Sequence, residues 1–392
     1  MPHDAEIMGL KDYEIKAISW QGERVVIQAR YTGPVFCPHC GCSRLRKKDR
    51  FVRKLRHETI GMRHGHLHLE ALKFCCLECG RYFNQRFPSI RPRLRSTEPF
   101  RRQVFWQHLD GICRKRLADR QRIGTATVER WFHDFLGLQA SKMSSEPCPE
   151  QLGIDEHFFT RRKGFATTLC DLKHHKVYDV VLGRSEASLE GFFRRLKGKE
   201  NVKLVCMDLA SNYRSLVRRH FPNAKIVADR FHVVRIVNHH FMAVWRELDP
   251  MSSRNRGLIS LMRRHPEKLQ PEQRLRLEAY FDEHPQVGAI YEFKQRLMRL
   301  LRHKTCTART CKKLIPQLLD YIHQLKTCGL SQLETLGRTL GSWAGEVAAM
   351  WRFSKNNGIT EGLHNKMEMI SRMAFGFRNF DNYRLRVRVM CA

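Results

Sequence analysis

The stretch VKLVCMDLA, residues 202–210, is a nearly continuous apolar run that carries one acid, Asp208, near its end. A short apolar run of this kind predicts a strand that is buried on both faces. The residues that follow alternate between helix and strand patterns, so we expect a helix, a strand and a second helix at 211–222, 224–231 and 232–248. A buried strand among helices predicts a covered α/β sheet.

Three further strand patterns precede this segment. QLGIDEHFFT, GFATTLCDL and KVYDVVLGR, at 151–160, 164–172 and 176–184, predict strands joined by tight turns, and the last two predict a hairpin. The stretch 185–198 predicts a helix with Ser185 as its N-cap. Three strands followed by alternating helices and strands predict a mixed α/β sheet that is covered on both faces.

Two acids are predicted to end apolar strands in this region. Asp155 comes after Leu152–Ile154, and Asp208 comes after Leu204–Met207. Covered sheets bind ligands at the carboxyl ends of their strands, so the two acids meet if their strands are neighbours. Adjacent carboxylates repel each other, and a divalent cation removes that repulsion. Mg²⁺ or Mn²⁺ takes oxygen ligands, and two such ions about 3.5–4 Å apart can hold both reacting oxygens of a phosphoryl displacement.

Such a metal site needs a third acid, and Glu361 is the candidate. The apolar residues after it recur at spacings of three and four, as they do in a packed helix: Leu363, Met367, Ile370 and Ala374. If this helix lies against the sheet, the partners of Glu361 are Asp155 and Asp208. Two other acids compete for the role: Glu368, two turns further along the same helix face, and Asp229, which ends a predicted strand.

The composition of the chain is strongly basic. Its 392 residues include 71 Lys and Arg against 39 Asp and Glu, a formal net charge of +32. On a folded chain this excess favours a polyanionic partner, nucleic acid before an anionic membrane surface. There is no long uncharged apolar run and no basic start followed by an apolar segment, so we expect a cytoplasmic protein without membrane contact. The length and the apolar content of 42% fit two or three domains.

The cysteines are clustered. Fourteen of them in a chain that we expect in a reducing compartment argue against a disulfide framework. The two CxxC pairs of the chain are Cys37/Cys40 and Cys76/Cys79. Four thiolates in two such pairs suit a structural Zn²⁺ ion, so we expect a zinc ribbon with a hairpin between its knuckles. Cys75 could replace Cys76, and Cys42 is a further thiol, so the ligand set stays open here.

A helical region follows the cysteines. Residues 44–102 are dense in Lys and Arg, which favours contact with the DNA backbone. Residues 96–138 contain helix patterns, the last two separated by a turn at Gly124, and this is the pattern of a helix-turn-helix motif. We expect Thr125 to be the N-cap of the last helix. The residues that would face a DNA groove are Thr125, Thr127 and Arg130.

Beyond residue 250 the pattern is helical and basic, with no strand pattern. Four helices are predicted, at 275–285, 290–303, 311–325 and 330–353. The expected fold class is therefore multidomain, combining α+β and α/β parts. In chain order we expect a β segment with the zinc ribbon, a helix-turn-helix, a linker, the first part of a mixed-sheet core, an all-helical insertion, and a helical end with the third acid. Their expected bounds are 1–95, 96–138, 139–150, 151–250, 251–345 and 346–392.

Five motifs occur in an order that resembles one known family. In chain order they are CPHCG (37–41), GIDE (153–156), CMDLASNY (206–213), VADRFHV (227–233) and GITEGLHNKMEMISRMAFGFRNFDNYRLRV (358–387). Together with the second CxxC pair and the helix-turn-helix pattern, they resemble the bacterial insertion-sequence transposases of the ISL3 family. The similarity runs over nearly the whole chain, and the last motif is the most specific.

The resemblance implies a DDE enzyme with a ribonuclease H-like catalytic core. Its catalytic and metal-binding acids would then be Asp155, Asp208 and Glu361, with the helical insertion between the second and the third. Asp229 and His232 look like an Asp-x-x-His signature with a supporting role in holding DNA or the reacting phosphate. The structural alternative is a histidine that Asp229 satisfies within the fold.

The resemblance also implies the function. The zinc ribbon and the helix-turn-helix would bind the double-stranded terminal inverted repeats of an insertion sequence, and the core would cleave strands and join them to target DNA. Synapsis of two ends implies at least a dimer, and a small-molecule substrate is not expected. The protein would act at the bacterial nucleoid.

Two sets of residues near the third acid could contact this DNA. Basic side chains would hold the phosphate backbone, and Trp343 or Trp351 could stack on an unpaired base. The basic residues are Arg372, Arg378 and Arg384. A DNA-binding regulator with the same N-terminal modules and an inactive core is the alternative reading of the whole pattern.

Overall fold

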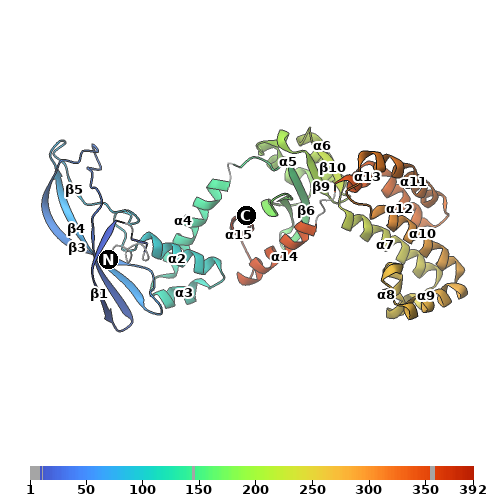
Figure 1. Cartoon of the computed structure of the whole chain (residues 1–392), viewed down its shortest axis with the longest axis horizontal. Coiled ribbons are helices and arrows are strands. Elements are labelled where there is room, and N and C mark those ends of the chain that lie inside the picture. The colour runs from blue at the N-terminus through green and yellow to red at the C-terminus, as the bar shows by residue number, and fades with distance from the viewer. Residues whose placement is uncertain (1–8, 11, 144–145, 354–357) are drawn as a thin grey trace. The chain divides into compact units, whose positions relative to one another are not determined.

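The computed structural model describes residues 9–10, 12–143, 146–353 and 358–392. Two residues of the expected linker, 144–145, lie outside the described residues. The chain forms two compact units, Met1–Ser141 and Lys142–Ala392 (Figure 1), each with its own hydrophobic core. Within the described residues, none of the helices has both the length and the apolar character needed to span a bilayer.

The N-terminal unit is built on a five-stranded sheet. Its strands are β1 (Tyr13–Gln21), β2 (Arg24–Tyr31), β3 (Leu45–Arg56), β4 (His64–Cys76) and β5 (Tyr82–Asn84). They lie in the order β1-β2-β4-β3, and β5 pairs with β4. The antiparallel hairpin of β3 and β4 confirms the hairpin that the sequence predicts between the two CxxC pairs.

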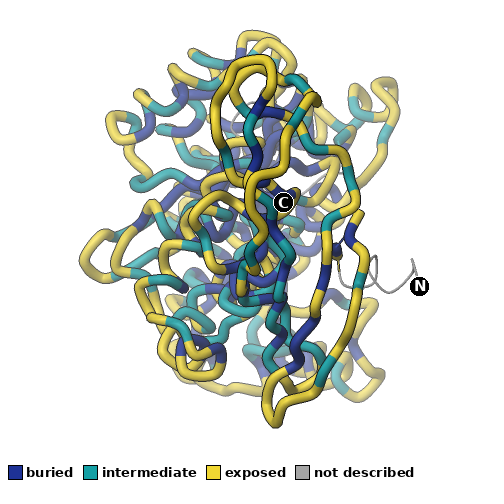
Figure 2. The backbone as a smooth tube through the Cα atoms, turned by 90° about the vertical axis from the view of Figure 1, so that its left-hand side faces the viewer, coloured by how far each residue is buried: buried dark blue, intermediate teal, exposed yellow. Residues whose placement is uncertain are grey.

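Side chains along β4 alternate between the core and the surface. Leu67, Leu69 and Ala71 are fully buried, and the residues between them are partly exposed. This period of two places one face of the sheet against the core. Figure 2 shows how the buried positions lie inside the backbone trace, while turns and outer faces are exposed.

Three helices complete the N-terminal unit: α2 (Glu98–Leu109), α3 (Arg114–Gln121) and α4 (Thr125–Met143). They pack around a small core of Phe100, Val104, Leu117, Ala118 and Val128. The turn between α3 and α4 includes Arg122, whose backbone is left-handed with φ of 52°. Because α4 begins at Thr125, this residue lies in the first turn and not at the expected N-cap position. The helix also continues to Met143, into the segment expected as a linker.

The second unit contains the predicted mixed sheet. Its strands are β6 (Gln151–Thr160), β7 (Gly164–Asp171), β8 (Lys176–Leu182), β9 (Leu204–Met207) and β10 (Lys225–Ala228). Their order is β10-β9-β6-β7-β8, with β6, β9 and β10 parallel to one another and β7 and β8 antiparallel to their neighbours. All five strands confirm the sequence patterns.

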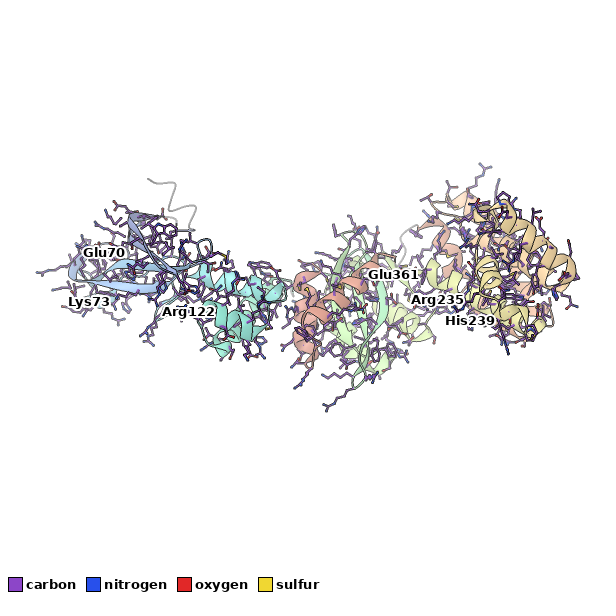
Figure 3. The ribbon with its side chains drawn as sticks, turned by 90° about the horizontal axis from the view of Figure 1, so that it is seen from below. Glu70, Lys73, Arg122, Arg235, His239 and Glu361 are labelled. Carbon is purple, nitrogen blue, oxygen red and sulfur yellow. The ribbon has the colours of Figure 1, made fainter. Side chains whose placement is uncertain are left out.

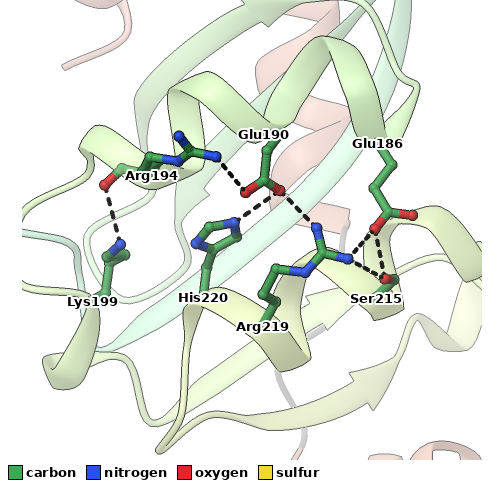
Figure 4. Close-up of polar contacts among 7 residues, drawn as sticks. All are labelled: Glu186, Glu190, Arg194, Lys199, Ser215, Arg219 and His220. Atoms are coloured by element: carbon green, nitrogen blue, oxygen red, sulfur yellow. Dashed lines mark hydrogen bonds and ion pairs between the residues drawn. The ribbon is translucent and has the colours of Figure 1, made fainter.

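Helices α5 (Glu186–Arg195) and α6 (Ser211–His220) pack against each other. In Figure 1 they lie on one side of the sheet, and α14 (Gly358–Met373) lies on the other. Arg219 bridges Glu186 and Glu190 at 2.7 and 2.9 Å, and His220 contacts the same Glu190 (Figure 4). Ser185 caps α5 as predicted, with its hydroxyl accepting from the N–H of Ser188. These contacts hold the two covering helices in register.

Helices also make up the region that follows the sheet. After α7 (Arg230–Leu248) come α8 (Arg256–Arg263), α9 (Pro271–Glu283), α10 (Pro285–Leu301), α11 (Ala308–Thr327), α12 (Ser331–Ser342) and α13 (Ala344–Arg352). No strand occurs among the described residues of 251–353, which confirms the helical prediction. The sequence patterns missed α8, and the last predicted helix is interrupted at Trp343.

The two tryptophans that could stack on a base are core residues instead. Trp351 is completely buried and Trp343 nearly so, and the guanidinium of Arg214 covers the ring of Trp343 at 3.7 Å. Arg214 also pairs with Glu346 at 2.6 Å. Because both rings contribute to packing between the helices and the sheet, the suggestion that they stack on DNA is wrong for this structure.

Gly337 of α12 allows a close approach of α11. A Cβ atom at this position would lie 2.9 Å from Cγ of Lys326 and 3.0 Å from both Cβ of Leu325 and the backbone N of Lys326. Gly345 of α13 has no such neighbour within 4 Å. The two glycines therefore differ in packing although both lie in helices.

We expect Gly337→Ala to lower the free energy of unfolding by about 1–3 kcal/mol, because two tightly packed helices must move apart. Gly345→Ala is the matched control and should change stability by no more than about 1 kcal/mol, in the stabilising direction. Thermal unfolding of both variants measures the difference. Equal melting temperatures would show that the contact between α11 and α12 is not tight.

Candidate active site

The register of two parallel strands brings the first two acids together. Ile154 of β6 pairs with Met207 of β9, so the residues that follow each of them, Asp155 and Asp208, emerge side by side. One correction concerns Asp155, which does not end its strand. Past Ile154 the strand loses β9 as a neighbour but stays paired with β7, where Asp155 lies opposite Thr168.

The third parallel strand adds Asp229 and His232. Asp229 directly follows β10, donates its N–H to the carbonyl of Met207 at 2.8 Å, and caps α7 by accepting from the N–H of His232 at 3.3 Å. The cap turns the imidazole towards the strand ends, where Nε2 of His232 lies 3.0 Å from Asp208 and 3.7 Å from Asp229. On its other side, Nδ1 of the ring contacts Arg235 at 2.7 Å.

These groups perturb one another's protonation. One ligand atom from each of Asp155, Asp208 and His232 lies within 4.8 Å of the other two. Burial and the charge of Asp208 raise the pKa of Asp155 to about 7. Burial alone would lower the pKa of His232, but the carboxylates of Asp208 and Asp229 raise it above its usual value. The site therefore concentrates negative charge that attracts a cation.

Helix α14 carries Glu361 in its first turn. It packs on β6, and three of the four apolar residues predicted for its buried face are buried: Leu363, Met367 and Ile370. His364, one turn after Glu361, lies 3.7 Å from Asp155 and 3.0 Å from the hydroxyl of Thr168. Figure 3 marks Glu361 at the first turn of this helix and Arg235 and His239 along α7. Glu361 is exposed and does not belong to the metal-binding group of Asp155, Asp208 and His232 found among the described residues.

A chain of polar side chains fixes this geometry, and the sequence analysis missed it. The hydroxyl of Tyr383 in α15 (Phe380–Met390) lies 2.9 Å from His157, and His157 lies 2.9 Å from Thr168. Thr168 in turn contacts His364. Burial lowers the pKa of His157 to about 3 and that of His364 to about 4, so both rings are neutral at pH 7. The sequence signal that could have identified His364 is its spacing of three residues from Glu361, which places both on one helix face.

The donor set fits a divalent cation. Mg²⁺ and Mn²⁺ take carboxylate ligands, and the pKa of one of these two carboxyl groups is raised by burial and by the charge of the other. An imidazole suits softer metals, so an all-oxygen set would use Glu361 and leave His232 beside it. Asp155 and Asp208 are therefore the residues that could hold such an ion, with Glu361 as the candidate third ligand.

The second metal-binding group lies in the N-terminal unit. It consists of Cys37, Cys40, Cys76 and Cys79. Two Sγ–Sγ distances, 3.6 and 3.5 Å, are close to the roughly 3.8 Å edge of a tetrahedron with Zn–S bonds of about 2.3 Å. Each CxxC pair is followed by a glycine with positive φ, Gly41 at 75° and Gly80 at 66°, which closes the knuckle. The cluster suggests zinc, and it contains both of the predicted CxxC pairs.

The two further thiols are not part of this cluster. The ligand atoms of Cys42 and Cys75 fall outside the group of four that lie within 4.8 Å of one another. Backbone N–H groups of Cys79 and Glu78 lower the pKa of Cys76 to about 6, which favours the thiolate that a metal binds. The geometry thus favours Cys76 over Cys75 as a ligand.

The residues predicted to bind DNA have different surroundings. Thr125 and Arg130 are exposed and Thr127 is partly exposed, all on the first two turns of α4. In the second unit, Arg378 is exposed and Arg372 pairs with Glu368 at 2.6 Å. The prediction that Arg384 holds the DNA backbone needs correction. Arg384 makes two hydrogen bonds to Asp179, at 2.6 and 2.7 Å, and so supports the fold.

Comparison with known proteins identifies the family of the chain. The family model of the ISL3 group of DDE enzymes, described as "Transposase", matches residues 152–387, which include both strand acids, the DRFH segment and Glu361. The transposase for insertion sequence element IS1001 of Bordetella parapertussis is 24% identical over 396 residues, a match that covers 97% of this chain and 95% of that protein. The chain belongs to the ISL3 family of DDE transposases, which are polynucleotidyl transferases.

Proposed function

We propose that this transposase binds the terminal inverted repeats of an insertion sequence, cleaves strands at the element ends and joins them to target DNA. The observation that carries the proposal is the pairing of Ile154 with Met207, which sets Asp155 and Asp208 side by side within the segment that the family model matches. Double-stranded DNA is then both substrate and target.

We infer that the mixed sheet is a ribonuclease H-like core. Three antiparallel strands, β6 to β8, are followed by two parallel strands, with β9 beside β6 and β10 beside β9. The helical segment from α8 to α13 separates this sheet from α14, as an insertion would. The order of elements along the chain supports the proposed order of a first core part, a helical insertion and a helical end with the third acid.

We propose catalytic roles for these residues from their positions. Asp155, Asp208 and Glu361 would hold the divalent ions, which when bound stabilise the attacking and leaving oxygens of an in-line displacement. His232 lies beside Asp208 and can donate a hydrogen bond to a phosphate oxygen or orient the carboxylate. His364 is neutral and holds α14 against β7 through Thr168. Arg372 and Arg378 would hold the DNA backbone.

The N-terminal unit supplies the DNA-binding surface in this proposal. Helices α3 and α4 would form the helix-turn-helix, with Thr125, Thr127 and Arg130 towards the groove, and the four-cysteine cluster would bind Zn²⁺ and brace the β3–β4 hairpin. Two element ends must be held together for strand transfer, so we propose that the active form is at least a dimer.

Replacing Asp208 by Asn is expected to abolish strand cleavage while DNA binding is kept. The amide keeps the shape of the side chain but removes the negative charge that a divalent cation needs, so activity should fall at least about a hundredfold. The assay uses a supercoiled plasmid with the gene and its native flanks, Mg²⁺, and equal DNA occupancy of both proteins. Asp320→Asn, an exposed acid of α11, is the control. Equal cleavage by parent and Asp208→Asn would refute the site.

A separate experiment tests whether Glu361 or Glu368 of α14 is the third metal-binding acid. Glu361→Gln should lose cleavage by a similar factor, because it removes a metal ligand. Glu368→Gln should stay within about threefold of the parent, since it removes only an exposed ion pair with Arg372. The same plasmid assay compares them. Loss of activity in Glu368→Gln but not in Glu361→Gln would assign the third acid to Glu368.

The zinc proposal predicts about one zinc ion per chain in purified protein. Cys76→Ser should lose most of this zinc and weaken binding to the end duplex, because the β3–β4 hairpin loses its brace. Cys75→Ser is the matched control, adjacent in sequence but outside the cluster, and should keep both zinc and affinity. Elemental analysis and a binding titration measure the two effects. Zinc loss in Cys75→Ser alone would change the ligand set.

A further inference from the structure

The N-terminal unit contains a cavity of about 570 Å³, and only Thr127 and Arg130 among its lining residues have a proposed role above. Its walls come from the end of β3, from the segment 91–96, from α2 and from the first turns of α4. All these residues lie within the unit Met1–Ser141. The cavity therefore exists independently of the catalytic unit.

The wall of this cavity is strongly positive. It is lined by five arginines: Arg56, Arg91, Arg95, Arg101 and Arg130. Asp134 is the acid among the lining residues. Arg91, Arg95 and Arg130 are exposed and form its rim. Five guanidinium groups against one carboxylate make an anion the natural occupant, because guanidinium matches phosphate geometry.

Arg101 sets this cavity apart from an ordinary basic surface. The residue is only 1% exposed, and its Nε and one terminal nitrogen are buried without a hydrogen-bond partner. Among the ion pairs of the described residues, none includes Arg101, although Glu98 and Asp134 act on it through space. Leaving a buried guanidinium unsatisfied is costly, so its donors require a partner that enters from the cavity.

Arg56 does not compete for that role. It is held by the side chains of His64 and His66, the latter at 3.0 Å, and its guanidinium lies over the ring of Phe100 at 5.1 Å. These contacts fix one wall of the cavity. Arg101 is thus the buried cation whose donors remain to be used.

The N-terminus of α4 reaches the same cavity. Gly124 and Thr127 line it, and the helix that follows is 19 residues long. The positive end of a helix dipole and its unpaired N–H groups favour an anion at this place. Two independent features, the buried Arg101 and the helix end, therefore select the same kind of ligand.

We propose that this cavity binds a backbone phosphate of the DNA duplex that α4 contacts. The assignment rests on the proposed DNA-binding function of the N-terminal unit. The phosphodiester oxyanion receives the free donors of Arg101 at the floor, while Arg95 and Arg130 hold it from the rim. Such a contact carries no sequence information, and it fixes the register of α4 on the duplex.

The test compares Arg101→Gln with Arg102→Gln in the full-length protein. Arg102 is the next residue of α2, exposed and paired with Glu98 at 2.8 Å, and loses the same charge. Affinity for the end duplex and for an unrelated duplex is measured over a range of salt concentrations. Arg101→Gln should weaken binding to both duplexes by about tenfold and reduce the slope of log K against log salt by about one. Arg102→Gln should stay within about twofold.

An unchanged slope in an Arg101→Gln protein with the parent's melting temperature would overturn the proposal. If this variant is less stable, Arg95→Gln at the rim takes its place, with single methylphosphonate substitutions along the end duplex. One neutralised phosphate should then weaken the parent strongly and Arg95→Gln little. Equal weakening of both proteins at every position would also overturn it.

Two further outcomes separate the sources of the anion. Inorganic phosphate that raises the melting temperature of the parent but not of Arg101→Gln, without any change in the DNA slope, would assign the cavity to a small anion and overturn the DNA assignment. A parent that binds both duplexes equally well would contradict the proposed recognition of element ends. The loss of slope in Arg101→Gln would still support the phosphate contact in that case.

Discussion

The proposed active site depends on one piece of backbone register, the parallel pairing of β6 with β9. With Ile154 opposite Met207, the next residue on each strand is an acid, and the two carboxylates must emerge at the same edge. A shift by one residue would turn one of them to the other face of the sheet. The completely buried Leu152, Ile154, Val205 and Met207 resist such a shift, so packing of the core holds two groups together that repel each other.

Two sets of contacts hold the groups that surround these acids. Asp229 follows the neighbouring strand and, by capping α7, sets the imidazole of His232 against Asp208. On the other side, Thr168 of β7 joins His157 to His364 and so fixes the first turns of α14. The rigid sheet carries two acids, and a helix that returns from far along the chain carries Glu361. In the proposed metal site, the position of the third ligand therefore depends on how α14 lies on the sheet.

The sequence predicted the five strands of the catalytic sheet and the four cysteines because each has a local signature: apolar runs, turn residues and CxxC spacing. It failed where tertiary contact decides. Asp155 lies within its strand because β7 continues the pairing, and Trp343 and Trp351 are buried because helices return onto the sheet. Arg384 is paired with Asp179, more than two hundred residues earlier, which no local pattern can show. His364 lay one turn from a predicted acid, yet its contact with Thr168 required the fold.

The helical segment before α14 has a structural role that its sequence does not reveal. Its last helix, α13, packs beside β10, and Glu346 of that helix pairs with Arg214 of α6 while Trp343 lies beneath the same guanidinium. Glu346 is largely buried, so breaking this pair would leave a carboxylate without its main partner, a cost well above that of a surface ion pair. The end of the helical segment is therefore anchored to the sheet that carries the two acids. This anchor limits where α14 can begin, and it ties the position of Glu361 to the strands that carry the other two proposed acids.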